Sequence, residues 1–405
     1  MTTKINPQTL KGFRDFLPDQ ALQRNWLINK LKSVFENFGF DPLETPALEY
    51  ASTLLGKYGE EADKLLYLFE DNGKRKVGLR YDQTVPLARV ISSYQNLPKP
   101  FKRYQIQPVW RAENTQRGRF REFLQCDIDI VGEKNILADF EIVNIVLKTF
   151  KTLGFNKTKI IINDRVNFKG LENKLINSID KLPKIGEEKV IEELTKKGLA
   201  KEEAAKILNK IKTAQKTDNI KKLFQLLKNQ GYQENTDFIY QPTLARGLDY
   251  YTGLIFEVID DDYQAGSLGG GGRYDNLIGL FTGQNIPAVG FAFGFDRIFE
   301  AANYLKLIPD IKTNTKILVT VFSPKLLQKS IEIASFLRDN NINTEIYLND
   351  DTKLDKQLKY ADKKGIQYVV IIGPDEAEKN TIKLKNMKTG EQKIINQKDL
   401  LNVKS

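Results

Sequence analysis

The chain contains no histidine and only one cysteine, Cys126, among its 405 residues. Without histidine, Ser-His-Asp and Cys-His catalysis and every imidazole-ligated metal centre are excluded. The usual general base near neutral pH is missing as well. A single cysteine can form neither an intrachain disulfide nor a thiolate zinc site. The chemistry left open uses Arg, Lys, Asp, Glu and Tyr, and it favours the handling of phosphate and carboxylate groups.

Long apolar runs are also missing, since none approaches the roughly 20 residues that a membrane helix needs. The N-terminal segment is polar from its first residues, which is not the pattern of a secretory signal. We therefore expect a cytoplasmic protein with no membrane partner. The 62 basic and 52 acidic residues give a net charge of +10. That charge is typical of a nucleic-acid-binding protein, but a lysine-rich soluble surface explains it equally well.

Hydrophobic periodicity divides the chain into four parts. Residues 1–165 and 233–310 mix helices with alternating strands and predict one core in two pieces. Residues 166–232 carry Lys, Glu and Leu at helical spacing, which predicts an inserted helical module. Residues 315–405 alternate strand and helix and predict a small α/β domain with a mostly parallel sheet. The predicted fold class is α+β, with an antiparallel sheet in the core.

A first group of chemistry-bearing residues lies on two predicted strands, 102–114 and 121–132, on either side of a basic loop. Alternate residues of a strand face the same side. One face then gathers arginine, carboxylate, amide and one aromatic ring, a combination that suits a nucleotide better than a core. A solvated, salt-bridged hairpin remains an equal alternative. The residues concerned are Arg111, Glu113, Phe123, Gln125, Asp127 and Asp129.

A second group is the glycine run 266–272 and the segment 290–297, in which small and apolar residues alternate. The run is neither a Walker loop nor a dinucleotide fingerprint. A strand face without side chains allows backbone or ligand to approach closely. Arg297 follows at the start of a predicted helix, where an arginine can clamp phosphate. Tight packing between strands is the alternative explanation for the glycines.

A third group is weaker when taken alone. Arg246 is followed by the pair Tyr250 and Tyr251, which can form a pocket that is apolar in body and polar at its tips. A tyrosine pair is nevertheless more often packing than binding. Asp82 and Thr84 end a predicted strand just before a helix, where they can equally be simple N-caps.

Together these stretches resemble the class II aminoacyl-tRNA synthetases, and more narrowly the histidyl-tRNA synthetase family. Residues 39–46, 111–127 and 290–297 are similar to the three class signatures, in order. The narrower resemblance rests on LARGLDYYTG (244–253) and GGGRYD (270–275), and on KGFRDFLP (11–18) and LRYDQTVPLAR (79–89). It covers essentially the whole chain. It implies a class II catalytic core, with residues 315–405 as an anticodon-binding domain.

The resemblance implies a binding site for histidine and ATP. The α-ammonium group of histidine would be held by Asp82, Thr84 and Gln125, with Gln83 in the same segment. The imidazole pocket would consist of Asp129, Tyr250 and Tyr251. Adenine would meet Glu113 and Phe123, and the distal phosphates would meet Arg119 and Arg297. Arg111 would bridge the substrate carboxylate and the α-phosphate, and Arg246 would stabilise the α-phosphate. Gln83 and Leu124 depart from the residues that many relatives carry there.

The implied function is ATP-dependent activation of L-histidine and its transfer to tRNA(His), with Mg²⁺ accompanying ATP, in a homodimer. The implied catalytic residues are Arg111, Arg246 and Arg297, with no metal ligand from His or Cys. The helical insert would contact the acceptor arm of the tRNA. The alternative is a catalytically silent paralogue that acts as the regulatory subunit of ATP phosphoribosyltransferase. The three arginines and the α/β tail favour the enzyme, and a purely RNA-binding module would leave the arginines without a role.

Overall fold

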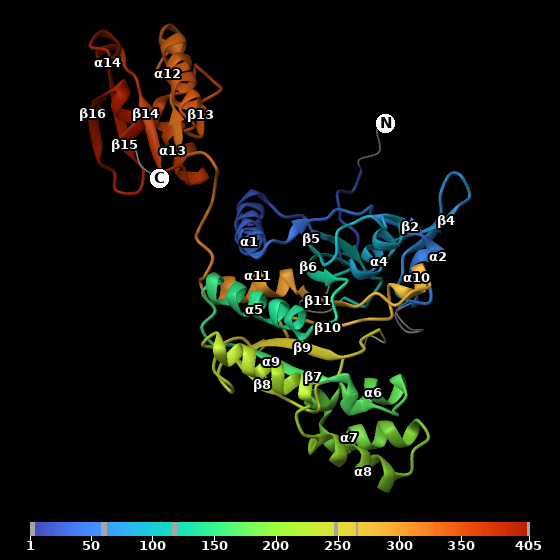
Figure 1. The fold of residues 1–405 in the computed structure, drawn as a ribbon. Coiled ribbons are helices and arrows are strands. Elements are labelled where there is room, and N and C mark those ends of the chain that lie inside the picture. Colours follow the sequence, from blue (N-terminus) through green and yellow to red (C-terminus); the bar gives the residue numbers. More distant parts are fainter. Residues whose placement is uncertain (1–4, 58–62, 116–119, 247–249, 265, 403–405) are drawn as a thin grey trace. The chain divides into compact units, whose positions relative to one another are not determined.

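The computed structural model describes residues 5–57, 63–115, 120–246, 250–264 and 266–402 (Figure 1). Its residues fall into two compact units, Met1–Asp15 with Leu27–Ile308, and Phe16–Trp26 with Pro309–Ser405. Within the described ranges, no helix is both long and apolar enough to cross a bilayer.

The larger unit is built on an eight-stranded sheet with the order β1-β5-β6-β11-β10-β9-β7-β8. Neighbouring strands run antiparallel except at the two edges, where β1 pairs with β5 and β7 with β8 in parallel. The predicted antiparallel core is therefore confirmed. The strands are β1 (Asp41–Pro42), β5 (Phe101–Trp110), β6 (Glu122–Val131), β7 (Thr158–Asp164), β8 (Phe238–Tyr240), β9 (Leu254–Asp260), β10 (Gly269–Arg273) and β11 (Ala288–Phe293).

Helices cover one face of this sheet. Helix α5 (Ile136–Leu153) begins at Asn135, whose side chain accepts a hydrogen bond from the Leu137 amide, and it ends at Gly154 in the left-handed conformation. It contacts β6, β7 and β11, and α11 (Phe295–Tyr304) contacts β6 (Figure 1). The ring of Phe150 packs against that of Phe293 with centroids 6.0 Å apart. This buried apolar layer leaves the opposite face of the sheet for polar residues.

The helical segment between β7 and β8 has two parts. Helices α6 (Asn173–Ile179), α7 (Leu182–Lys196) and α8 (Lys201–Lys212), which follow the short helix η1 (Arg165–Phe168), share an apolar cluster. Helix α9 (Asp218–Asn229) packs instead against α5 and β7 of the sheet (Figure 1). Its Phe224 ring meets the Phe238 ring of β8 edge-on at 4.7 Å. The returning helix thus anchors the segment to the sheet.

A smaller sheet, β2-β4-β3, lies in the same unit, beside α4 (Thr84–Ser93). Its strands are β2 (Leu48–Tyr50), β3 (Leu68–Glu70) and β4 (Lys76–Leu79), with α2 (Ala51–Leu54) after β2, and α10 (Gly279–Thr282) also contacts α4. Arg80 follows β4 and is 2% exposed. Its guanidinium donates to the carbonyls of Thr45 at 2.6 Å and Pro108 at 2.8 Å and to the side-chain oxygen of Gln107 at 2.9 Å. One arginine therefore joins the segment after β1 to β5.

The second unit contains a five-stranded sheet with the order β13-β12-β14-β15-β16. The first three strands pair in parallel, as the alternation of strand and helix predicted, whereas β15 and β16 are antiparallel. The expectation of a mostly parallel sheet is thus wrong for the second half of the unit. The elements are β12 (Ile317–Val319), η2 (Pro324–Leu326), α12 (Leu327–Asp339), β13 (Thr344–Ile346), α13 (Leu354–Lys364), β14 (Tyr368–Ile371), α14 (Pro374–Glu378), β15 (Thr381–Asn386), β16 (Gln392–Asn396) and η3 (Gln397–Asn402).

The first prediction concerns Arg80. Arg80→Met removes the donor from buried carbonyl groups, and each unsatisfied group costs about 1–3 kcal/mol. We expect the free energy of unfolding to fall by about 3 kcal/mol. Urea denaturation measures this free energy. Unfolding is followed by the fluorescence of Trp110 in a Trp26→Phe background, because Trp110 lies in the same unit as Arg80. The control Arg75→Met alters an exposed arginine, which pairs with Asp71 and also interacts with Tyr50, and it should change little. An equal effect of both substitutions would contradict the structural role of Arg80.

Candidate active site

The face of the large sheet opposite α5 carries rows of polar residues and glycines, and one of these rows crosses five strands. Asp129 of β6 lies between Arg103 of β5 and Gly290 of β11. The next row on the same face places Asp127 between Gln105 and Ala292. In that row Ala292 is followed by Gly270 of β10 and Glu257 of β9. The strand register therefore aligns residues that are distant in sequence.

The glycines of this face make room for charged side chains. A Cβ atom on Gly270 would lie 2.6 Å from Cζ of Arg246, and one on Gly290 would lie 2.6 Å from Cγ of Asp129. Real Cβ atoms do not approach other heavy atoms so closely. The Arg246 guanidinium and the Asp129 carboxylate therefore lie directly against the backbone of β10 and β11. Any larger residue would displace them.

A buried charge cluster occupies the β5–β6 end of the face. Arg103 is 0% exposed, and its Nη2 lies 2.6 Å from Oδ2 of Asp129 and 4.0 Å from Oδ2 of Asp127. The hydroxyl of Tyr274 donates to the Asp129 carboxylate. Burial raises the pKa of Asp129, against the opposing effect of Arg103. Burial also raises the pKa of Asp127 to about 8, with Arg103 opposing and Asp129 adding to the shift.

A chain of hydrogen bonds leads from this cluster to Arg111. Gln125 donates from Nε2 to Oδ2 of Asp127 at 2.8 Å, and its Oε1 accepts from Nη2 of Arg111 at 3.2 Å. The Arg111 guanidinium also lies over the rings of Tyr81 at 4.3 Å and Phe123 at 4.9 Å. Arg111 Nε donates to the Tyr81 carbonyl at 3.1 Å. Hydrogen bonds and two rings thus hold the guanidinium in one orientation.

The tyrosine pair joins the remaining predicted residues. The ring of Tyr250 lies 4.8 Å from that of Tyr251 and 5.8 Å from that of Tyr274. Burial raises the pKa of Tyr250 well above its usual value, and Tyr251, Asp82 and Thr84 also act on it. The ring of Tyr251 lies 5.9 Å from Cζ of Arg246.

Arg246 itself is held by two neighbours. Its Nη1 forms an ion pair with Oε2 of Glu257 at 3.3 Å. Its carbonyl accepts a hydrogen bond from Nη1 of Arg165 at 3.4 Å, at the start of the helical segment. The predicted members of the histidine pocket therefore surround the glycine-lined face.

Four predicted residues stand apart from these contacts. Gln83 is 0% exposed, and its Nε2 donates to the carbonyls of Gln107 and Gln125, so its side chain supports strands. Arg297 donates from Nη1 to the Ser267 carbonyl at 2.9 Å. The carbonyl of Glu113 accepts from Arg121 at 3.1 Å. Arg119 lies outside the described residues.

The structure adds residues to which the sequence analysis assigned no role. Arg103, Tyr274 and Glu257 contact predicted members of the site directly. A charged or polar residue at every second position from Arg103 to Gln107 was the available signal for Arg103. Only the pairing with β6 turns that pattern into a contact. Tyr274 belongs to the motif GGGRYD (270–275), but no function was predicted for this tyrosine.

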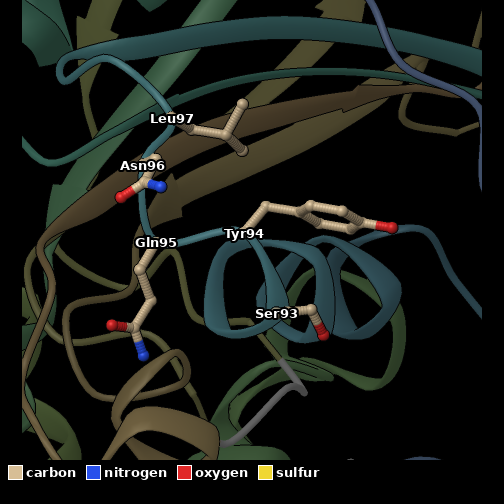
Figure 2. Close-up of a pocket in the computed structure, with 5 residues that line it drawn as sticks. All are labelled: Ser93, Tyr94, Gln95, Asn96 and Leu97. Carbon is tan, nitrogen blue, oxygen red and sulfur yellow. The ribbon is translucent and has the colours of Figure 1, made fainter.

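Two further features of the molecule bear on bound groups. In the described part of the chain, no group of three or more His, Cys, Asp or Glu residues is arranged to hold a metal ion. A surface pocket lies where α4 ends and the chain turns toward β5 (Figure 2). It is lined by Ser93, Tyr94, Gln95, Asn96 and Leu97. None of the predicted site residues lines it, and we assign it no role.

Comparison with known proteins gives consistent matches. The family described as histidyl-tRNA synthetase matches residues 12–201 and 168–298, and the anticodon binding domain family matches residues 316–403. The histidine–tRNA ligase of Cytophaga hutchinsonii is 40% identical, over 95% of this chain and 96% of its own. That of Christiangramia forsetii is 39% identical, over 95% and 96%. The crystal structure of histidyl-tRNA synthetase from a Nostoc species is 31% identical, with a TM-score of 0.83 over 98% of this chain and 99% of its own.

The second prediction follows from the buried carboxylate of Asp127. Its pKa is raised to about 8 in the folded protein, against about 3.9 in the unfolded chain. Between these values the native state binds the proton and the unfolded state does not, so stability falls as pH rises from about 4 to about 8. Asp127→Asn removes this contribution. We expect the variant to gain stability relative to the wild type across that window, as measured by urea denaturation at several pH values. A difference that stays constant with pH would contradict the shifted pKa.

Proposed function

Because the chain belongs to the histidyl-tRNA synthetase family and is therefore an aminoacyl-tRNA ligase, we propose that it activates L-histidine with ATP at the glycine-lined face and transfers it to tRNA(His). The main support for the proposal is that the charged groups at this face are held in fixed orientations. Arg111 is oriented by Gln125 and by the Tyr81 and Phe123 rings, and Arg246 by Glu257 and the bare backbone of Gly270.

The amino acid is proposed to bind between the β5–β6 cluster and the tyrosines. Asp129 and Tyr250 with Tyr251 would enclose the imidazole ring, which offers a donor and an acceptor nitrogen. The α-ammonium group would meet Asp82, Thr84 and Gln125. A site built from buried polar groups rejects amino acids without matching nitrogens, because its own groups would stay unpaired. For Gln83 we propose a supporting role, in keeping with its bonds to strand carbonyls.

ATP is proposed to lie on the Arg111 side of the site. Phe123 would stack on adenine and Glu113 would bond to it, while Arg119 and Arg297 would bind the distal phosphates. The Mg²⁺ that accompanies ATP would arrive as part of the substrate, held by phosphate oxygens. The residues of this chain contribute cationic groups, and these suit a polyphosphate.

The proposed chemistry needs no general base. A carboxylate oxygen of histidine, already ionised at pH 7, attacks the α-phosphorus of ATP. The new P–O bond forms as the bond to pyrophosphate breaks, and pyrophosphate leaves with the electron pair. Arg111 and Arg246 would align the two substrates and stabilise the negative charge of the transition state. This accounts for an enzyme without any histidine of its own.

The tRNA is proposed to contact two further regions. The lysine-rich helices between residues 166 and 232 would meet the acceptor arm, since phosphates attract basic surfaces. Residues 315–405 would read the anticodon, in line with the family match over 316–403. We also propose a cytoplasmic homodimer. Exposed apolar side chains on the small sheet, Leu48, Tyr50, Leu68 and Phe69, support a protein contact there.

The regulatory-paralogue alternative receives less support. The curated relatives that match over nearly the whole chain are named as ligases. Arg111 and Arg246 are both held toward the face that the pocket residues surround. A silent paralogue would have no need to orient them.

The third prediction tests the proposed chemistry. In Arg111→Ala or Arg246→Ala, one charge-assisted contact to the transition state is lost, which typically lowers the rate by about 100- to 1,000-fold. The measurement is single-turnover formation of histidyl-adenylate at saturating ATP and histidine. Gly270→Ala should show a similar loss, because the added methyl group displaces the Arg246 guanidinium.

The matched control is Arg338→Ala. This arginine belongs to the second unit and donates to the Thr344 carbonyl at 3.1 Å. Its adenylation rate should equal that of the wild type. Full activity in Arg111→Ala or Arg246→Ala would remove that arginine from the mechanism, and pyrophosphate exchange with another amino acid in place of histidine would overturn the proposed substrate.

The fourth prediction concerns residues 315–405. A chain that ends at Ile308 should still form histidyl-adenylate, while the tRNA concentration needed for transfer rises. Steady-state aminoacylation over a range of tRNA concentrations separates the two effects. The reason is that the proposed active-site residues all precede residue 309, whereas anticodon contacts would be lost with the tail. A shortened chain that charges tRNA at wild-type concentrations would disprove the assignment.

A further inference from the structure

One buried carboxylate of the site, that of Asp127, has no function in the proposed chemistry. Asp127 is 2% exposed and lies in the middle of the polar face, between Gln105 and Ala292. Its Oδ2 accepts from Gln125 at 2.8 Å. Its Oδ1 is buried and has no hydrogen-bond partner among the described residues. A buried carboxylate oxygen without a partner is costly, so it points to a missing donor.

The groups that face Asp127 carry more negative than positive charge. On its own strand and on β5 these are Asp129 and Arg103, and Asp82 acts from the start of α4. The segment before β9 adds the neutral hydroxyl of Tyr251, which Asp127 influences. On the other side, β11 and β10 present the uncharged Ala292 and Gly270, and the Arg246 guanidinium that lies against Gly270 forms an ion pair with Glu257.

Arg103, the arginine that pairs with this cluster, is already engaged. Arg103 lies 2.6 Å from Asp129 but 4.0 Å from Asp127. Its Nη1 donates to Gln105 at 3.0 Å. The cation is therefore committed to Asp129, and Asp127 lacks a counter-charge of its own.

We propose that Asp127 is the exchangeable counter-charge of the substrate's α-ammonium group: it carries a proton in the empty pocket and releases that proton when the ammonium binds. The inference rests on the proposed binding of histidine. On binding, the Asp127 carboxylic acid loses one proton to solvent. The resulting carboxylate accepts a hydrogen bond at Oδ1 from an N–H of the ammonium group. No other bond changes. The ammonium is favoured over the imidazole because Asp127 bonds directly to Gln125, which is proposed to hold that group.

The titration of the site agrees with this role. Burial raises the pKa of Asp127 to about 8, so the carboxyl group is mostly protonated at pH 7. A cation placed against it favours the charged form and lowers that pKa. Histidine binding should therefore release close to one proton at pH 7 and fewer as pH approaches 9. Between pH 6 and 7 the affinity for histidine should rise about tenfold, and the rise should become smaller as pH approaches 8.

The test is isothermal titration calorimetry at pH 7 in buffers of different ionisation enthalpy, which counts the protons released. The ligands are L-histidine, histidinol, which keeps the ammonium but lacks the carboxylate, and imidazolepropionate, which lacks the ammonium. The proteins are the full chain, Asp127→Asn and the control Cys126→Ala. Cys126 is the adjacent buried residue and faces the other side of β6. Comparing variants cancels any proton exchange of the ligand's own imidazole.

We expect the wild type and Cys126→Ala to release nearly one proton more than Asp127→Asn with histidine and with histidinol, and no such excess with imidazolepropionate. Asp127→Asn should also lose this rise in affinity with pH. Equal proton release in the wild type and Asp127→Asn would overturn the inference, as would an excess with imidazolepropionate. If the variant does not fold, the ligand series on the wild type decides alone. If histidine fails to bind the wild type, the proposed function is what fails.

Discussion

The site depends on one steric constraint, the absence of side chains along the middle of the large sheet. Gly270 and Gly290 leave a space that the Arg246 guanidinium and the Asp129 carboxylate fill, each against the backbone. The two charges come from outside β10 and β11, yet these strands decide where they lie. A Cβ atom at either glycine would overlap the charged group beside it. The two glycines therefore determine where the charged groups lie, and not which charged groups they are. Arginine and carboxylate are therefore oriented before any substrate arrives, which is the condition for stabilising a charged transition state.

Burying so many charges is expensive unless each has a partner, since removing one ion from water costs several kcal/mol. Arg103 and Asp129 satisfy one another at 2.6 Å, with the Tyr274 hydroxyl as a further donor. Gln125 links Asp127 to Arg111 through its amide. The network of buried charges adds little to the stability of the fold. The apolar residues of α5, which pack on the other face of the sheet, stabilise it instead. One sheet thus separates an apolar face that holds the fold together from a polar face that carries the candidate site.

Sequence patterns predicted the elements better than the contacts between them. The periodicity of residues 136–152 and 354–364 predicted α5 and α13 closely, because their apolar stripes are regular. The alternation around the basic loop predicted β5 and β6, but a pattern of period two does not reveal which residue lies opposite Arg103. The partnership of Arg103 with Asp129 therefore emerged only from the register. Strands β15 (TIKLKN) and β16 (QKIIN) were missed because polar residues interrupt their short apolar runs and mask the strand pattern.

The helical segment is tied to the pocket more closely than an inserted domain needs to be. Leu175, Ile179 and Val190 share one apolar cluster with Leu244, Tyr251 and Ile255, which border the site. Arg165, at the entry of the segment, bonds to the carbonyl of Arg246 itself. A close-packed cluster does not deform gradually, so a shift of α6 is passed on to Tyr251 and to the arginine loop. The same packing that completes the pocket wall therefore joins the helical segment to the candidate site.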